Sequence, residues 1–119
     1  MQYAILIYSD EKQGANATPE ESEAWMGEYN AYTQAMATAG VMKGGEALHP
    51  TSAATTVHVK DGKKITTHGP FAETKEQLGG FYLVECPNLD EAIEWAAKCP
   101  GARVGSIEVR PVMDFSQPQ

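Results

Sequence analysis

The stretch TPEESEAWMGEYNAYTQAMATAG, residues 18–40, contains the clearest helix signal in the chain. Thr18 is suited to the N-cap, and Glu21 completes a T-x-x-E capping box with it. Pro19 occupies the first helical position, where no backbone N–H is needed. One apolar stripe follows at helical spacing, formed by Trp25, Tyr29, Tyr32 and Met36. The final glycine suits a helix stop. We therefore predict a long helix over residues 19–39.

Short apolar segments on both sides of this helix predict strands. The expected strands are residues 3–8, 41–49, 55–60, 64–68, 78–86 and 104–112. Residues 3–8 are apolar on both faces, which favours a central place in the sheet. Asn88 can cap a second helix that ends near residues 99–101, with Leu89, Ile93 and Ala96 or Ala97 expected on its packing face.

Asp61-Gly62 lies between two short strands and predicts a β-hairpin. A two-residue loop would place Val59 opposite Lys64 and mix the two faces. A three-residue loop, residues 60–62, would instead pair Val57 with Ile65 and keep the β-branched side chains together. We predict the three-residue loop. In that register His58 and His68 share a face but lie too far apart for one zinc ion, so no metal site is expected.

The order of elements is strand, long helix, several strands with a hairpin, helix, strand. This order predicts an α+β fold with a ferredoxin-like antiparallel sheet and two helices on one face. Residues 1–112 would form a single domain and residues 113–119 a polar tail. Because the helices cover only one face of the sheet, we expect a homodimer packed sheet to sheet, a dimeric α+β barrel-type assembly. A pocket is expected between each sheet and its helices or at the dimer seam.

The composition restricts the partners. The 119 residues contain 16 Asp or Glu against 9 Lys or Arg, a formal net charge of −7. An acidic chain is a poor match for nucleic acid or an anionic membrane. No apolar run reaches the roughly 18 residues that span a bilayer. Cys86 and Cys99 are too few for a disulfide framework and are expected to be free thiols in a cytoplasmic protein.

Residues 68–80, HGPFAETKEQLGG, gather the chemically active groups. Gly69-Pro70 predicts a turn, and Phe71 is expected to anchor the segment in the core. A structured loop of mixed charge beside a sheet can hold a general acid/base pair. It can equally be a solvated connector, and the composition does not decide. No cofactor motif accompanies it, because P-loop, C-x-x-C and nucleophile-elbow patterns are all missing, so no cofactor is expected.

The segment HGPFAETKEQLGGFYLVE, residues 68–85, resembles the signature of the YCII-related superfamily, in particular its DGPF-motif branch. The resemblance extends through MQYAILIYSD (1–10), VMKGGEALHP (41–50), LDEAIEWAAKCPGA (89–102) and GSIEVRPV (105–112). It implies a small dimeric ferredoxin-like protein, whose genes in bacteria commonly lie beside those of extracytoplasmic-function sigma factors. For the wider superfamily it implies a proposed His–Asp active-site pair and, in some members, lyase-type activity.

This chain departs from that pattern at the proposed active site. The Asp that names the branch is His68 here. The first helix has no histidine over residues 23–29, and residues 98–100, where the partner Asp would be sought, read Lys-Cys-Pro. The superfamily's proposed pair is therefore not present in this sequence.

Two functions remain open. The favoured one is a small-molecule-binding or regulatory module that works with a sigma factor or another protein. Its pocket residues would be Glu46, Lys75, Tyr82 and Arg110. The alternative is a cofactor-free lyase, isomerase or hydrolase acting on a small polar or aromatic substrate. In that case His68 would be the general base, Glu73 would orient it, and Lys75 or Arg110 would hold an anionic group.

Overall fold

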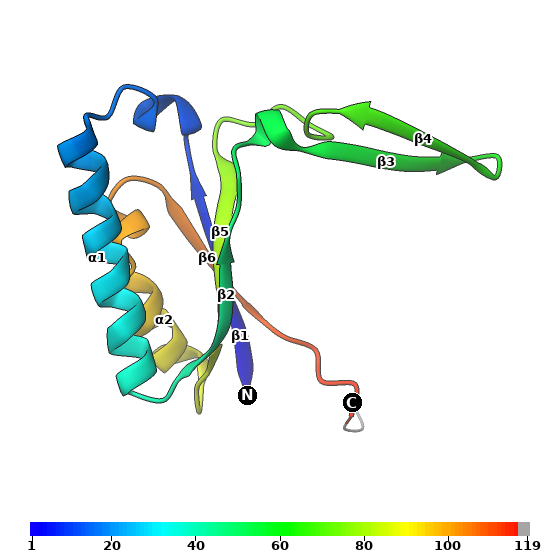
Figure 1. The fold of residues 1–119 in the computed structure, drawn as a ribbon. Helices are drawn as coiled ribbons and strands as arrows, with labels where there is room; N and C mark the ends of the chain where they lie inside the picture. The colour runs from blue at the N-terminus through cyan, green and yellow to red at the C-terminus, as the bar shows by residue number, and fades with distance from the viewer. Residues whose placement is uncertain (117–119) are drawn as a thin grey trace.

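The computed structural model describes residues 1–116 (Figure 1). The strands are β1 (Gln2–Ser9), β2 (Met42–Ala47), β3 (Thr55–Lys60), β4 (Lys63–His68), β5 (Gln77–Glu85) and β6 (Ser106–Pro111). The α-helices are α1 (Pro19–Thr38) and α2 (Leu89–Lys98), and the 3₁₀ turns are η1 (Glu11–Gly14), η2 (Thr51–Ala53) and η3 (Pro100–Arg103). The end of the predicted polar tail, residues 117–119, lies outside the described residues.

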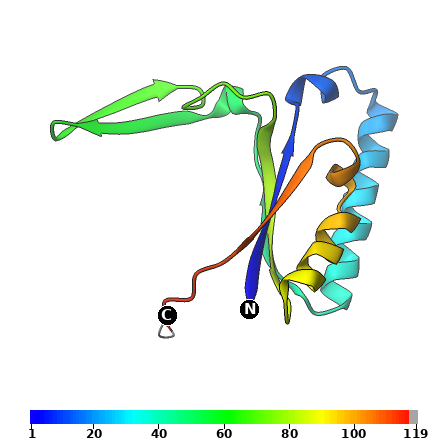
Figure 2. The same ribbon diagram turned by 180° about the vertical axis from the view of Figure 1, so that it is seen from behind.

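Four strands form one antiparallel sheet in the order β2-β5-β1-β6. Without β3 and β4, the chain order is β-α-β-β-α-β, and the sheet order is that of the ferredoxin-like type. Both α-helices cover the same face of this sheet (Figures 1 and 2). The predicted α+β class, the position of the helices and the central place of β1 are therefore confirmed.

The N-terminus of α1 has the predicted capping box. The hydroxyl of Thr18 accepts the backbone N–H of Glu21 at 3.1 Å, and the Glu21 carboxylate accepts the backbone N–H of Thr18 at 3.2 Å. Because Pro19 has no N–H, this helix start leaves three N–H groups without helical partners, and two of them are satisfied in this way. Farther along the helix, Tyr32 and Met36 are buried, so the predicted stripe does face the sheet.

The core lies between the sheet and the helices. Tyr3, Ile5 and Ile7 alternate along β1 and are buried against Met36 and other residues of this layer. Cys86 and Cys99 are also buried there and are both unpaired, as predicted. Removal of this apolar surface from water is the main stabilising contribution to the fold.

The other face of the sheet carries no helix, and we call it the open face. Its residues follow from the strand register, because residues directly opposite one another share a face. Ala4 lies opposite Leu83, and Leu6 lies opposite Phe81. All four alternate with buried neighbours and are themselves only half-buried. The open face therefore has an apolar centre.

The packing face of α2 differs from the prediction. Ala92 and Ala96 are buried, whereas Leu89 is 46% and Ile93 47% exposed. The side chain of Asn88 caps the helix by accepting the Glu91 N–H at 3.0 Å. Small alanines facing the sheet allow the helix backbone to approach it closely. The predicted packing face was therefore wrong for Leu89 and Ile93 and right for Ala96.

The hairpin register also differs from the prediction. Val59 lies opposite Lys64 and His58 opposite Ile65, so the loop is the two-residue Asp61-Gly62. The φ angles of 52° and 76° at Asp61 and Gly62 are those of a type I′ turn. Both strands are exposed along almost their whole length, so no buried face selects a register and the turn decides it. The predicted three-residue loop was wrong.

The β3–β4 hairpin projects from the body on the side opposite the helices (Figures 1 and 2). Its strands form a two-stranded sheet separate from the main one. The radius of gyration is 16.6 Å, whereas a compact chain of this length has about 13–14 Å. The hairpin is thus an extended arm.

Candidate functional site

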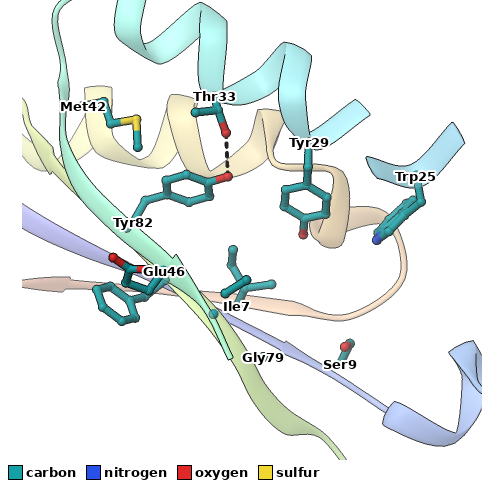
Figure 3. Close-up of a pocket in the computed structure, with 13 residues that line it drawn as sticks. Ile7, Ser9, Trp25, Tyr29, Thr33, Met42, Glu46, Gly79 and Tyr82 are labelled. Atoms are coloured by element: carbon teal, nitrogen blue, oxygen red, sulfur yellow. Dashed lines mark hydrogen bonds between the residues drawn. The ribbon is translucent and has the colours of Figure 1, made fainter. Parts of the chain in front are cut away.

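A cleft of about 430 Å³ lies between α1 and the sheet (Figure 3). Trp25, Tyr29 and Thr33 of α1 form one wall. The other wall comes from the sheet and includes Ile7, Ser9, Met42 and Tyr82. The volume falls within the range of about 300–1,000 Å³ that is typical of small-molecule sites.

The helix residues of the cleft share a face because they are spaced four apart. Trp25, Tyr29 and Thr33 therefore stand one above another along α1. Trp25 and Tyr29 pack edge to face, with ring centroids 5.5 Å apart. This contact holds two aromatic rings in a fixed orientation beside the cavity.

Glycines in β2 and β5 allow these strands to come close together under the cleft. A Cβ atom at Gly45 would lie 2.8 Å from the carbonyl oxygen of Phe81, and one at Gly80 would lie 2.9 Å from that of Glu46. Larger side chains would push the two strands apart. At Gly80 the closely approaching group is therefore the backbone of β2.

The polar groups of the cleft are mainly hydroxyls. The hydroxyls of Tyr82 and Thr33 are hydrogen-bonded at 2.8 Å, as the dashed line in Figure 3 shows. The Tyr29 hydroxyl accepts the S–H of Cys99 at 3.6 Å. Burial, followed by this contact with Cys99, raises the pKa of Tyr29 well above its ordinary value. Tyr29 therefore keeps its proton near neutral pH and can act as a hydrogen-bond donor.

Charged groups are scarce around the cleft. Among the described residues that line it, Glu46 is the charged one, with its side chain on the open face opposite Phe81, and none is Lys, Arg or His. An anionic ligand would lose its hydration without gaining a cationic partner, which is costly. The arrangement suits an uncharged molecule with an apolar or aromatic body.

The family model for the YCII-related domain matches residues 1–116. The chain belongs to the YCII-related family. A relative from Rhizobium meliloti (strain 1021), described as an uncharacterised protein, is 43% identical over 114 residues. The match covers 94% of this chain and 92% of that relative. The resemblance seen in the sequence is confirmed at the level of the family.

Two of the predicted site residues of this YCII-related protein, Glu46 and Tyr82, border the cleft. Tyr82 faces the helices, whereas Glu46 lies opposite Phe81, so its side chain is on the open face. Their roles as ligand-binding residues stay predictions. Sequence reasoning missed Trp25, Tyr29, Thr33 and Ser9 as cleft residues. Trp25 and Tyr29 belong to the predicted apolar stripe, but they are only half-buried, whereas Tyr32 and Met36 are buried. One signal for Trp25 and Tyr29 was available in the sequence. The aromatic stripe of α1 is longer than the part of the helix that is buried.

The remaining predicted residues lie elsewhere. His68 ends β4, and Glu73 and Lys75 follow it in the connection to β5; all three are exposed and none lines the cleft. Arg110 lies opposite Ala4 on the open face, where its guanidinium donates to Glu108 at 2.8 Å. This hydrogen bond lowers the pKa of Glu108. The structure therefore does not bring these residues to the cleft.

The segment after β4 is not anchored in the core. Phe71 is 85% exposed, so the predicted anchor was wrong. The segment lies at the base of the hairpin, where the chain passes from β4 to β5 (Figure 1), and residues 71–75 are all exposed. His68 lies opposite Thr55, which places it on the other face of the hairpin from His58 and not on the same face as predicted.

Within residues 1–116, no group of three or more His, Cys, Asp or Glu side chains could hold a metal ion. Neither α-helix of the described part is long and apolar enough to cross a membrane.

Proposed function

We propose that this YCII-related protein binds a small, uncharged molecule with an aromatic or apolar body in the cleft between α1 and the sheet. The observation that carries the proposal is the chemistry of the walls. The rings of Trp25, Tyr29 and Tyr82 surround a space of about 430 Å³, and Glu46 is the charged residue among its described lining. Aromatic contacts of this kind contribute about 0.5–1.5 kcal/mol each beyond the burial of area.

The hydroxyls support binding and orientation of the ligand. A Tyr29 phenol with a raised pKa donates a hydrogen bond near neutral pH and is a poor proton acceptor. The Tyr82 hydroxyl is already held by Thr33, so it meets the ligand in a fixed position. A preorganised hydroxyl costs little conformational entropy on binding. These features favour a binding module over a site for proton abstraction.

The other predicted roles stay predictions. These are the assignment to the DGPF-motif branch, the regulatory link to a sigma factor, the cytoplasmic location, and the enzyme alternative with His68 as general base. The enzyme alternative requires a substrate that reaches His68 at the end of β4, where the side chain is exposed. Among the ion pairs of the described residues none joins His68 to a carboxylate, so the geometry gives the binding module the stronger support.

A fluorescence titration tests the proposed ligand class. The chain has two tryptophans, so Trp95→Phe leaves Trp25 in the cleft wall as the reporter. Benzamide and benzoate have nearly the same shape but differ in charge. We expect benzamide to change Trp25 emission saturably with a Kd at least about tenfold lower than that of benzoate, because the carboxylate finds no cation.

The matched control is Trp25→Phe, which keeps Trp95 between α1 and α2 as the reporter. Its emission should not respond to benzamide. Equal affinities for benzamide and benzoate would contradict the proposed ligand class, and a response seen only at Trp95 would contradict the proposed site.

We also propose that two copies pair through their open faces. The half-buried Leu6, Phe81 and Leu83 form an apolar centre that the helices leave uncovered. A second open face offers the same apolar centre, with charged residues such as Glu108 and Arg110 beside it, and a two-fold axis buries both centres at once. Leu83→Glu should disrupt this pairing, as measured by sedimentation at micromolar concentration.

A further inference from the structure

The β3–β4 hairpin contributes no residue to the core or to the cleft. Val57 is 55%, Val59 72% and Ile65 44% exposed. Val57 and Val59 lie on one face of the hairpin, and Ile65 on the other. A lone two-stranded hairpin is at best marginally stable in water, and exposed apolar side chains on both of its faces mark a contact surface.

The direction of the hairpin indicates what it contacts. It leaves the body at one end of the sheet and extends on the side of the open face, away from both helices (Figures 1 and 2). Six residues per strand at about 3.3 Å each give the arm a length of about 20 Å. Two packed sheets lie only about 10 Å apart. An arm of this length therefore extends past the sheet of any copy that packs on the open face and reaches its helix layer.

Charge separates the arm from the rest of the chain. Residues 55–68 contain Lys60, Lys63 and Lys64 against Asp61, a formal charge of +2. The other 105 residues contain 15 acidic and 6 basic residues, a formal charge of −9. The lysines gather at the turn, which is the far end of the arm. The tip is thus complementary to the body of a second copy of this chain.

We propose that the hairpin is an exchanged arm. In a pair of copies, each arm lies along the other copy, with its valines against that copy's sheet layer and its lysines against that copy's acidic surface. A two-fold pair supplies both surfaces twice, because each copy offers one arm and one acidic body. This inference rests on the proposed pairing of open faces and goes beyond it by assigning the hairpin to the interface.

Sedimentation of hairpin variants tests the exchange. Wild-type protein at micromolar concentration should sediment at twice the 12.9 kDa chain mass. Val57→Glu should raise the dimer dissociation constant at least about tenfold, since it places a charge in an apolar contact. The matched control is Val104→Glu: Val104 is 54% exposed but lies after η3, and this variant should dimerise like wild type.

A second variant tests the contribution of the lysine charges and leaves the valines of the apolar contact in place. Replacing Lys60, Lys63 and Lys64 by glutamate should weaken the dimer by about tenfold or more at low salt and by less at high salt. The hairpin lies outside the core, so both arm variants should stay folded, with the circular dichroism spectrum of the wild type.

The outcomes separate the two proposals. A wild-type monomer at micromolar concentration overturns both the pairing of open faces and the arm exchange. A wild-type dimer that Leu83→Glu disrupts, but that both arm variants leave intact, overturns the arm exchange alone. Disruption by Leu83→Glu and by both arm variants supports the two together.

Discussion

Replacing Ser9 by phenylalanine is expected to weaken benzamide binding by about 100-fold or more, as measured by Trp25 emission in the Trp95→Phe background. Ser9 follows Ile7 in the alternation of β1, so its side chain points toward the helices and into the cleft (Figure 3). A phenyl group there occupies space that the ligand needs. Ser9 is at the end of its strand and only half-buried, so the fold should tolerate the change.

The control for this variant is Ser9→Ala, which removes the hydroxyl but adds no volume. It should bind benzamide within about threefold of the parent protein, a difference of well under 1 kcal/mol. Undiminished binding by a folded Ser9→Phe variant would show that the ligand lies outside the cleft.

The largest effect on stability is expected at Met36. This side chain is 0% exposed and packs in the core between α1 and the sheet. Met36→Ala should lower the free energy of unfolding by about 2–5 kcal/mol, because it removes buried methylene groups and leaves a cavity. Urea denaturation followed by circular dichroism measures this change.

The same helix offers a matched control in Met26, which is 65% exposed. Met26→Ala makes the same chemical change and should alter the free energy of unfolding by no more than about 0.5 kcal/mol. Equal losses in the two variants would contradict the position of the core.

Much of the fold could be predicted because local signals and burial agree there. The capping box at Thr18 and Glu21 begins α1, and the same helix buries Tyr32 and Met36. Residues that are apolar on both faces place β1 at the centre of the sheet. In each case the sequence pattern that predicts the element also predicts which of its residues are buried.

The errors occur where burial gives no guidance or where small residues decide. The hairpin is exposed on both faces, so the turn at Asp61-Gly62 sets its register. In α2 the alanines pack closely against the core layer, and the larger Leu89 and Ile93 stay outside. A ranking by hydrophobicity alone would bury Leu89 and Ile93 before the alanines.

The cleft could be predicted only in part. Tyr82 and Glu46 were identified as pocket residues in the sequence, and both line it. Trp25 and Tyr29 were predicted only as members of the apolar stripe, and a helical stripe has the same spacing whether it fills a core or borders a cavity. Which residues of the stripe are covered depends on how far the sheet extends beneath the helix, and this is a tertiary property.

Methyl NMR during a benzamide titration tests the central claim most directly, because it locates the ligand. The methyl groups of Ile7 and Met42 report the cleft, and those of Leu6 and Leu83 report the open face. We predict saturable shifts at Ile7 and Met42, with Leu6 and Leu83 unchanged. Shifts confined to Leu6 and Leu83, with Ile7 and Met42 unmoved, would contradict a binding site between α1 and the sheet.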